Sequence, residues 1–312
     1  MIKITADIFS GRPNPEWIVS GEEAKAALRS LSGARGAVAT LDSGFSGLGS
    51  RGLIVDILSE EEQLDYGLPT SFRLAGGGSS DESHGQEVAE RLVRAMTEPG
   101  ALDHPAVASA QAEAGSVLYL PLDAGLQTFI IEGLPAASGS VVTEESQRAP
   151  DEAQAADAEA AAVCNIEVGA FNPGFWNDPA HIGRNNCYNY ASNRRTDTFA
   201  QPGRASGRMY TRINCAEVTN GAVSDGASLG CAPADQAPRW YMALVIAPGP
   251  GFIDYHWYRK SREGFWGHKP GGTAARNTDN SGRVITNPQT ANRGPYTIFC
   301  RYMFAQKRMV VR

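Results

Sequence analysis

The chain has 312 residues, of which 42% are hydrophobic and 20% are charged, and its formal net charge is −6. This length allows two ordinary domains, and the composition is typical of a soluble globular protein. No run approaches about 18 apolar residues, so we expect no membrane-spanning helix. The charge is divided unevenly: residues 1–162 carry 10 basic and 25 acidic residues, whereas residues 163–312 carry 18 and 9. The two halves are expected to differ in role or solvation, or to attract each other.

The first 135 residues are predicted to form a small α/β domain. Residues 10–17 are a Pro- and Gly-rich loop, and residues 20–31 are predicted to be a helix that begins with a capping box at Ser20 and Glu23. A second helix is expected over 85–96. Strands are expected at 2–9, 52–58, 71–74, 117–120 and 128–132. No nucleophile with a partner is found here, so a binding or regulatory role is predicted.

Residues 136–162 are rich in Ala, Ser and Glu and poor in aromatic residues, which is typical of a linker. We place the domain boundary in this acidic segment. The remaining residues, 163–312, are predicted to form a second domain, so that the fold class is α+β. Its expected elements are helices over 187–195 and 216–225, a strand over 240–247, a hairpin around residues 256–268, a long polar stretch over 269–290 and a strand or short helix over 296–304.

All five cysteines lie in the second half: Cys164, Cys187, Cys215, Cys231 and Cys300. An odd number leaves one thiol over if the others form disulfides, and Cys187 is the candidate for that thiol. The other four form either two disulfides or ordinary buried thiols. The N-terminus lacks the apolar region of a secretory signal, so the default expectation is a cytoplasmic protein, with export by another route as the alternative.

The predicted hairpin carries two histidines. Its loop is Lys-Ser-Arg-Glu-Gly, and a register symmetric about Arg262 would place His256 opposite His268 and Tyr258 opposite Trp266. Side chains alternate along a strand, so all four would share one face. Asp254 lies on the same face as His256 and competes with His268 as the group that orients its ring.

Cys187 lies at the start of a predicted helix. Asn185 or Asn186 can cap that helix, and its dipole would lower the pKa of the thiol, as would Arg184 nearby. A disulfide or a buried, inert thiol is the structural alternative. The pattern Asn-Cys-Tyr-Asn-Tyr-Ala at a helix start, followed by a strand with a histidine, resembles the papain-like fold of bacterial NlpC- and CHAP-type hydrolases.

The resemblance implies a C-terminal papain-like domain with an antiparallel sheet that cleaves amide bonds of peptides, such as bacterial cell-wall peptides. By the same resemblance Cys187 would be the nucleophile, His256 the base, and His268 or Asp254 its orienter. Asn185 or Asn186 would supply the oxyanion donor. Trp176 and Tyr190, with other aromatic residues, would form a substrate-stacking wall or part of the core.

Two other interpretations remain open. The second half could be a disulfide-stapled binding or toxin module for carbohydrate or protein, with Cys187 paired and no catalysis. A zinc site of His181, His256, His268 and Asp254 is the metal alternative, but no metal or other cofactor is expected. Arginines before Cys215 are interpreted as a solvated or substrate-rim face without a nucleic-acid motif. The sequence leaves the oligomeric state open.

Overall fold

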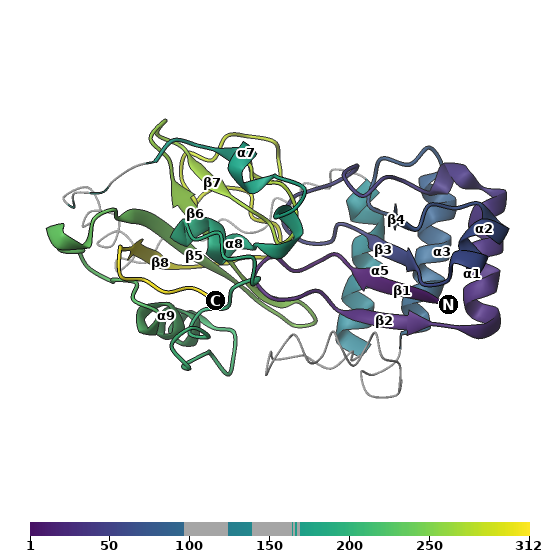
Figure 1. Ribbon diagram of the computed structural model, residues 1–312, viewed down its shortest axis with the longest axis horizontal. Coiled ribbons are helices and arrows are strands. Elements are labelled where there is room, and N and C mark those ends of the chain that lie inside the picture. The colour runs from purple at the N-terminus through teal and green to yellow at the C-terminus, as the bar shows by residue number, and fades with distance from the viewer. Residues whose placement is uncertain (97–123, 139–163, 165, 167–168) are drawn as a thin grey trace. The chain divides into compact units, whose positions relative to one another are not determined.

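The computed structural model describes residues 1–96, 124–138, 164, 166 and 169–312 (Figure 1). The chain forms two compact units. The first comprises residues 1–8, 14–45 and 49–141, and the second comprises residues 9–13, 46–48 and 142–312. Two short segments of the N-terminal half therefore belong to the second unit.

The first unit contains a four-stranded antiparallel sheet with strand order β2-β1-β3-β4. The strands are β1 (Ile2–Ala6), β2 (Glu16–Val19), β3 (Leu53–Ile57) and β4 (Ser71–Leu74). Alternate residues of the central strand β3, Leu53, Val55 and Ile57, are buried, as period-two side-chain alternation requires. Strand β2 was missed by the sequence analysis because it lies beside a Pro-rich loop.

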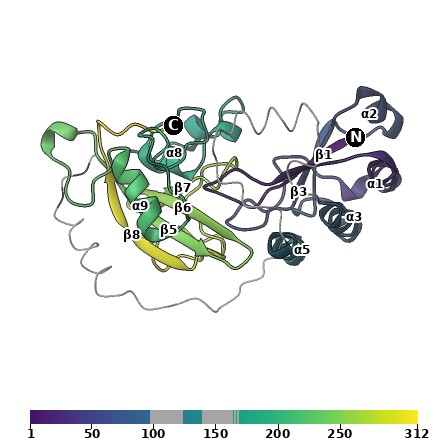
Figure 2. The same cartoon turned by 90° about the horizontal axis from the view of Figure 1, so that it is seen from below.

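Three helices of this unit, α1 (Gly21–Gly33), α3 (Glu82–Arg94) and α5 (Ala124–Ser138), lie in a row with α3 in the middle (Figure 2). The predicted helices at 20–31 and 85–96 correspond to α1 and α3. Ser20 is the N-cap residue of α1, but its side chain makes no capping hydrogen bond, so the predicted capping box is wrong. Asp81 instead caps α3 by accepting a hydrogen bond from the amide of His84.

The strand predicted at 128–132 is part of helix α5, and the strand predicted at 117–120 lies outside the described residues. Leu126, Ile130 and Leu134 are buried at helical spacing. A short apolar run does not distinguish a strand from a buried helix, and here the four-residue spacing decides.

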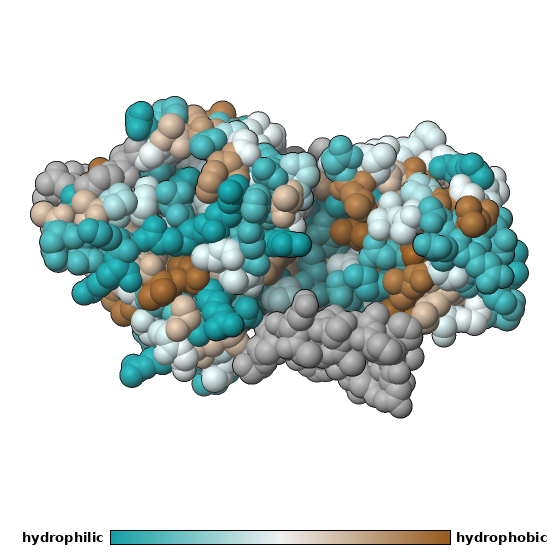
Figure 3. All heavy atoms as spheres, in the orientation of Figure 1, coloured by the Kyte–Doolittle hydropathy of each residue, from teal (hydrophilic) through white to brown (hydrophobic). Residues whose placement is uncertain are grey.

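A short helix, α2 (Glu60–Tyr66), was also missed, and it has no buried residue. Ser59 caps it, and Gly67 ends it in the left-handed conformation at φ +59°. Its Leu64 is 82% exposed among acidic neighbours. Figure 3 shows this hydrophobic spot among hydrophilic side chains over α2.

The second unit contains a four-stranded antiparallel sheet with strand order β7-β6-β5-β8. Its strands are β5 (Trp240–Pro248), β6 (Ile253–Lys260), β7 (Trp266–His268) and β8 (Ile298–Ala305). Its helices are α7 (Pro173–Trp176), α8 (Cys187–Ser192) and α9 (Cys215–Ser224), with 3-10 turns at Ile182–Arg184 and Ala234–Gln236. Helix α8 packs on β6 and β5, and Tyr188 lies 5.5 Å from Trp257 between ring centroids.

The predicted hairpin forms, but its register differs from the prediction by two residues. Tyr258 pairs with His268, and Lys260 pairs with Trp266. The shift arises because the loop closes about Glu263 rather than Arg262, with the amide of Ser261 donating to the carbonyl of Phe265. A shift of two residues keeps side chains on the same face, so His256 and His268 become diagonal neighbours.

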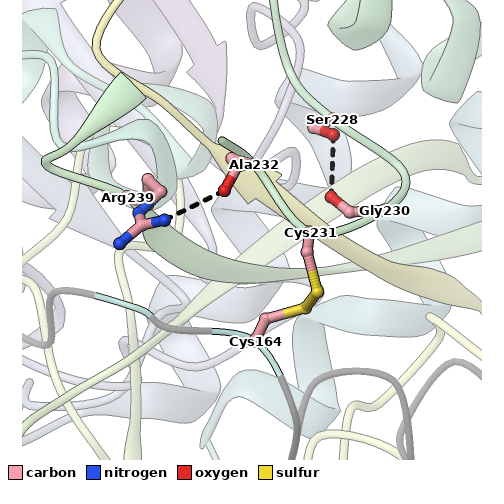
Figure 4. Close-up of a disulfide and its surroundings, with 6 residues drawn as sticks. All are labelled: Cys164, Ser228, Gly230, Cys231, Ala232 and Arg239. Carbon is pink, nitrogen blue, oxygen red and sulfur yellow. Dashed lines mark hydrogen bonds between the residues drawn. A yellow bond between two sulfur atoms is a disulfide. The ribbon is translucent and has the colours of Figure 1, made fainter. Parts of the chain in front are cut away.

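The second unit contains two disulfides. One joins Cys164 to Cys231 (Figure 4), and the other joins Cys215 to Cys300. Cys187 is free, as predicted, and it is buried. Beside the first disulfide, Arg239 donates to the carbonyl of Ala232 at 2.9 Å. The first disulfide joins two residues outside helices and strands, and the second joins α9 to β8.

The described residues form a mixed α/β protein with two antiparallel sheets, which confirms the fold class at this level. Apart from the last turn of α5, the predicted linker at 136–162 lies outside the described residues, so the domain boundaries stay a prediction. In the described part of the chain, no helix has the length and apolarity needed to cross a membrane.

Candidate functional site

Cys187 begins helix α8 and is fully buried. Its thiol points at the carbonyl of Tyr255 on β6, with Sγ 4.0 Å from the oxygen. Burial raises the pKa of the Cys187 thiol well above its ordinary value, and the nearby Asp254 carboxylate raises it further. The predicted lowering of this pKa is therefore wrong, because desolvation outweighs the main-chain hydrogen bonds at the short helix.

The structure brings His256 and His268 together, as the sequence predicted. His256 Nε2 lies 2.8 Å from His268 Nδ1, and both side chains are buried. His268 Nε2 lies 2.9 Å from the carbonyl of Thr278, and His256 Nδ1 lies 3.0 Å from the hydroxyl of Ser10. The four groups form one continuous buried chain of hydrogen bonds.

The proton positions in this series of hydrogen bonds follow from the neutral state of His268 and from the Thr278 carbonyl that it contacts. Burial and the positive charge of Arg276 lower the pKa of His268 to about 3, so its ring is neutral at pH 7. The Thr278 carbonyl can only accept, which places the His268 proton on Nε2 and leaves Nδ1 to accept from His256. Both ring nitrogens of His256 are therefore engaged, one by His268 and the other by Ser10.

Asp254 anchors the N-terminal loop of residues 9–13. Its carboxylate accepts hydrogen bonds from the amides of Ser10, Gly11 and Arg12 at 2.6, 3.1 and 3.2 Å, and from the hydroxyl of Tyr296 at 2.6 Å. Burial raises the pKa of Asp254, while these hydrogen bonds act in the opposite direction. Successive amides that converge on one carboxylate form a stable anion nest.

Gly11 is required where this loop meets β6. A Cβ atom at this position would lie 2.4 Å from the carbonyl oxygen of Tyr255. The carbonyl of Gly11 accepts from the side-chain amides of Asn186 and Gln201 at 2.7 and 2.9 Å. The sequence analysis missed Ser10 and Gly11 because a Gly- and Pro-rich loop gives no signal of a partner more than 240 residues away.

Asn186 caps α8, as predicted, but neither predicted oxyanion residue has a free amide. The Asn186 Oδ1 accepts from the amides of Tyr188 and Asn189, and its Nδ2 donates to the carbonyls of Gly11 and Ala200. Asn185 is engaged in the same way. Its Oδ1 accepts from the amides of Thr196 and Asp197, and its Nδ2 donates to His181 and Asp197.

The predicted aromatic substrate wall is part of the core. Trp176 and Tyr190 are buried, with ring centroids 5.3 Å apart, and they pack with Ala275 and Phe171. Of the two alternatives left open for these residues, the structure favours packing. Lys269, which the sequence analysis also missed, is buried nearby and donates to the carbonyls of Ile182, Asn185 and Gly271.

The four residues of the metal alternative do not form a ligand set, although His256 and His268 bond to each other. His181 pairs with Asp197 at 2.8 Å, away from the His256–His268 chain. Within the described ranges, no group of three or more His, Cys, Asp or Glu residues is arranged to hold a metal ion.

Comparison with known proteins gives one informative relative. No protein-family model matches the chain, and no solved structure matches it. A curated relative is insoluble matrix shell protein 1 of Ruditapes philippinarum, which is 47% identical over 145 residues. The matched stretch is 46% of this chain and 93% of the relative. The chain belongs to the family of this shell matrix protein.

This membership corrects the main functional prediction. The relative, which is matched over nearly its whole length, is a shell matrix protein. We predicted a bacterial cysteine hydrolase of the NlpC or CHAP type that acts on a peptide or peptidoglycan-like substrate. This prediction is wrong. The disulfides fit the alternative of a stapled module, although Cys187 is free rather than paired as that alternative required.

The predicted cytoplasmic default is also wrong. Two disulfides, Cys164–Cys231 and Cys215–Cys300, form and persist in an oxidising, extracellular environment. The relative named as a shell matrix protein points to the same location. The N-terminal sequence alone did not carry this information.

Proposed function

We propose that this chain is a non-catalytic, disulfide-stapled module of an extracellular matrix, and that it binds an insoluble carbohydrate or protein component of that matrix. The observation that carries the proposal is the 47% identity to insoluble matrix shell protein 1 over 93% of that relative. The two disulfides support it, because a matrix component must keep its fold outside the cell for long periods.

The chemistry of the buried polar groups supports the absence of catalysis. Cys187 is fully buried and its pKa is raised, whereas a nucleophilic cysteine needs an exposed and stabilised thiolate. Both ring nitrogens of His256 are occupied, by His268 and Ser10. The amides of Asn185 and Asn186 are bound to carbonyls, so they support loops rather than an oxyanion.

The second unit is, in this proposal, a papain-like scaffold that serves as a structural framework. What supports this is the order of its elements: a cysteine at the start of α8, then antiparallel strands that carry His256 and His268. The packing of α8 on β6 and β5 supports it as well. Superposition of an experimental structure on papain-like domains would test it, and a different helix–sheet arrangement would overturn it.

The functional proposal is tested by binding of the full chain to insoluble polymers. The oxidised protein would be incubated with particles of cellulose, chitin, elastin and keratin, and the bound fraction measured after sedimentation. Saturable binding to at least one polymer is expected, and Cys187→Ala should bind as the unchanged protein does. Absence of binding to all four, or loss of binding in Cys187→Ala while the fold is retained, would overturn the proposal.

A further inference from the structure

Basic residues of the second unit gather where the loop 194–208 meets the C-terminal segment. The Arg194 guanidinium donates to the carbonyl of Lys307 at 3.0 Å, and the amide of Gln201 donates to the carbonyl of Arg312 at 2.9 Å. The two segments therefore lie side by side. Their cationic residues, which we call the basic patch, are Arg194, Arg204, Arg208, Lys307, Arg308 and Arg312.

In the part of the second unit that the structure describes, the cations of the basic patch take part in no ion pair. Among the described residues of this unit, the ion pairs are His181–Asp197 and Arg212–Glu217, and neither involves the patch. Burial lowers the pKa of Arg204, Tyr255 and Tyr210 act in the opposite direction, and the positive charge of Arg312 lowers it. The buried Nε atom of Arg204 has no hydrogen-bond partner in the described structure.

Asp197, which lies within the loop 194–208, pairs with His181. Two other described carboxylates lie near the two segments of the patch. Asp225 lies beneath the loop, where it accepts from the amides of Gly203 and Ser206 and from the hydroxyl of Tyr188. Asp235 lies at the edge, next to Gln236, whose carbonyl accepts from the amide of Lys307. A surface with such an excess of positive charge is suited to an acidic partner.

The basic patch also contains an exposed apolar side chain. Val310 is 62% exposed, and Lys307, Arg308 and Arg312 flank it in the sequence. An apolar centre with a charged rim is the usual composition of a protein–protein interface. This feature favours a folded protein partner over a purely anionic polymer.

A surface of the complementary kind exists on the first unit of the same chain. Helix α2 presents Leu64, which is 82% exposed, among Glu60, Glu61 and Asp65, which are also exposed. The fourth acidic residue of this helix, Glu62, pairs with the N-terminal amine of Met1. Residues 1–162 carry 25 acidic and only 10 basic residues, so this half of the chain has a net negative charge.

We propose that the basic patch of one copy binds the α2 surface of a second copy. The contact joins two different surfaces, so each copy keeps one surface of each kind unoccupied for a further copy. Such a head-to-tail contact builds open chains unless its rotation happens to close a ring. The inference goes beyond the proposed function, because it names a second copy of the chain as a partner and requires no bound polymer.

The test is the oligomeric state of the full, oxidised chain by sedimentation velocity at pH 7.5, in about 0.01 M and about 1 M salt. We expect oligomers that grow with protein concentration at low salt and dissociate at high salt. The net charge of −6 makes copies repel each other at low salt, so association there requires complementary surfaces. A monomer at every concentration and salt level would overturn the proposal, including the case in which the two surfaces meet within one copy.

Charge reversal identifies the surfaces. Arg308→Glu with Arg312→Glu should weaken association about tenfold or more, because like charges then face each other. The control, Arg262→Glu with Arg283→Glu, changes the net charge equally at exposed positions outside the patch and should leave association within about twofold of the unchanged chain. An equal effect of the control would overturn the assignment of the patch.

A mixing experiment gives the complementary test. Glu61→Arg with Asp65→Arg should also abolish self-association. When this variant is mixed with the Arg308→Glu, Arg312→Glu variant, its basic patch meets the unchanged α2 surface of the other, so complexes should form. Failure of the mixture to associate, when circular dichroism shows both variants folded, would overturn the proposed pairing.

Discussion

Burial determines the chemistry of Cys187. A thiol at a helix start is reactive where solvent can reach it and its thiolate is stabilised, but Cys187 is fully enclosed and faces a carbonyl. The same residue type at the same helical position therefore serves as a small apolar side chain that packs α8 on β6.

The first prediction concerns this thiol. In the oxidised, native protein, alkylation at pH 8 should modify no cysteine rapidly, because Cys187 is buried and the other four are in disulfides. Denaturation without reductant should expose one thiol, and denaturation with reductant should expose five. Mass spectrometry after alkylation gives both numbers, and rapid native modification of Cys187 would contradict the structure.

His268 makes the stability of the fold depend on pH. Its pKa is about 3 in the folded chain, compared with about 6.5 when unfolded. Below pH 6.5 the unfolded chain takes up a proton that the folded chain does not, so the contribution of His268 is complete above pH 6.5 and is lost as the pH falls toward 3. The expected slope is about 1.4 kcal/mol per pH unit.

Urea unfolding at pH 7 and pH 5 measures this effect. The free energy of unfolding should decrease by about 2 kcal/mol more in the unchanged protein than in His268→Gln, which cannot titrate. Asp254, with its raised pKa, acts in the opposite direction, and the comparison between the two proteins removes its contribution. Equal pH dependence in both would contradict a neutral, buried His268.

At the scale of the elements, the sequence predicted a helix or strand correctly where one local signal dominated, such as a cap or an apolar run. The start of α8 at Cys187 and its Asn cap, and the apolar run of β5, appear where the sequence placed them. The α5 segment was predicted as a strand because the three apolar residues Phe129, Ile130 and Ile131 form a run too short to show a period. The hairpin register was wrong by two because the loop, rather than the strands, fixes it.

The candidate site shows where sequence reasoning ends. The pairing of His256 with His268 follows from the hairpin, which is a local feature. The contacts of Asp254 with Ser10 and of Asn186 with Gly11 join residues 244 and 175 positions apart, and no local pattern indicates such a pair. These distant contacts occupy the groups that catalysis would have required.

The cap of α8 can be tested separately from its distant contacts. Asn186→Ser keeps a capping oxygen but loses the hydrogen bonds donated to Gly11 and Ala200. Asn186→Ala loses the capping oxygen as well as these hydrogen bonds. We expect Asn186→Ala to lose about 2–4 kcal/mol of unfolding free energy, and Asn186→Ser to lose about 1 kcal/mol less. Exposed Asn220→Ala on α9 is the control and should change stability by less than about 0.5 kcal/mol. Identical stability of Asn186→Ala and the unchanged protein would contradict this role.

At the scale of the whole molecule, the disulfides restrict the conformations that the unfolded chain can adopt. The bond between Cys215 and Cys300 closes a loop with a sequence separation of 85 residues. The double variant Cys215→Ala, Cys300→Ala lacks this bond and should lose about 4 kcal/mol of unfolding free energy. The reason is that the unfolded chain gains much conformational freedom when a loop of this length is opened. Thermal or urea unfolding measures the loss, with Cys187→Ala as the control. A loss no larger than that of the control would contradict a stabilising role.

The entry of residues 9–13 into the second unit has a consequence for proteolysis. A single cut between residues 138 and 164 gives an N-terminal fragment that carries Ser10, Gly11 and Arg12, the donors that Asp254 requires. Both disulfides lie within the C-terminal fragment, so no covalent bond would join the pieces. A nicked molecule should nevertheless migrate as one particle in a native gel and as two bands in detergent, because residues 9–13 of the N-terminal fragment stay hydrogen-bonded to Asp254 of the C-terminal fragment.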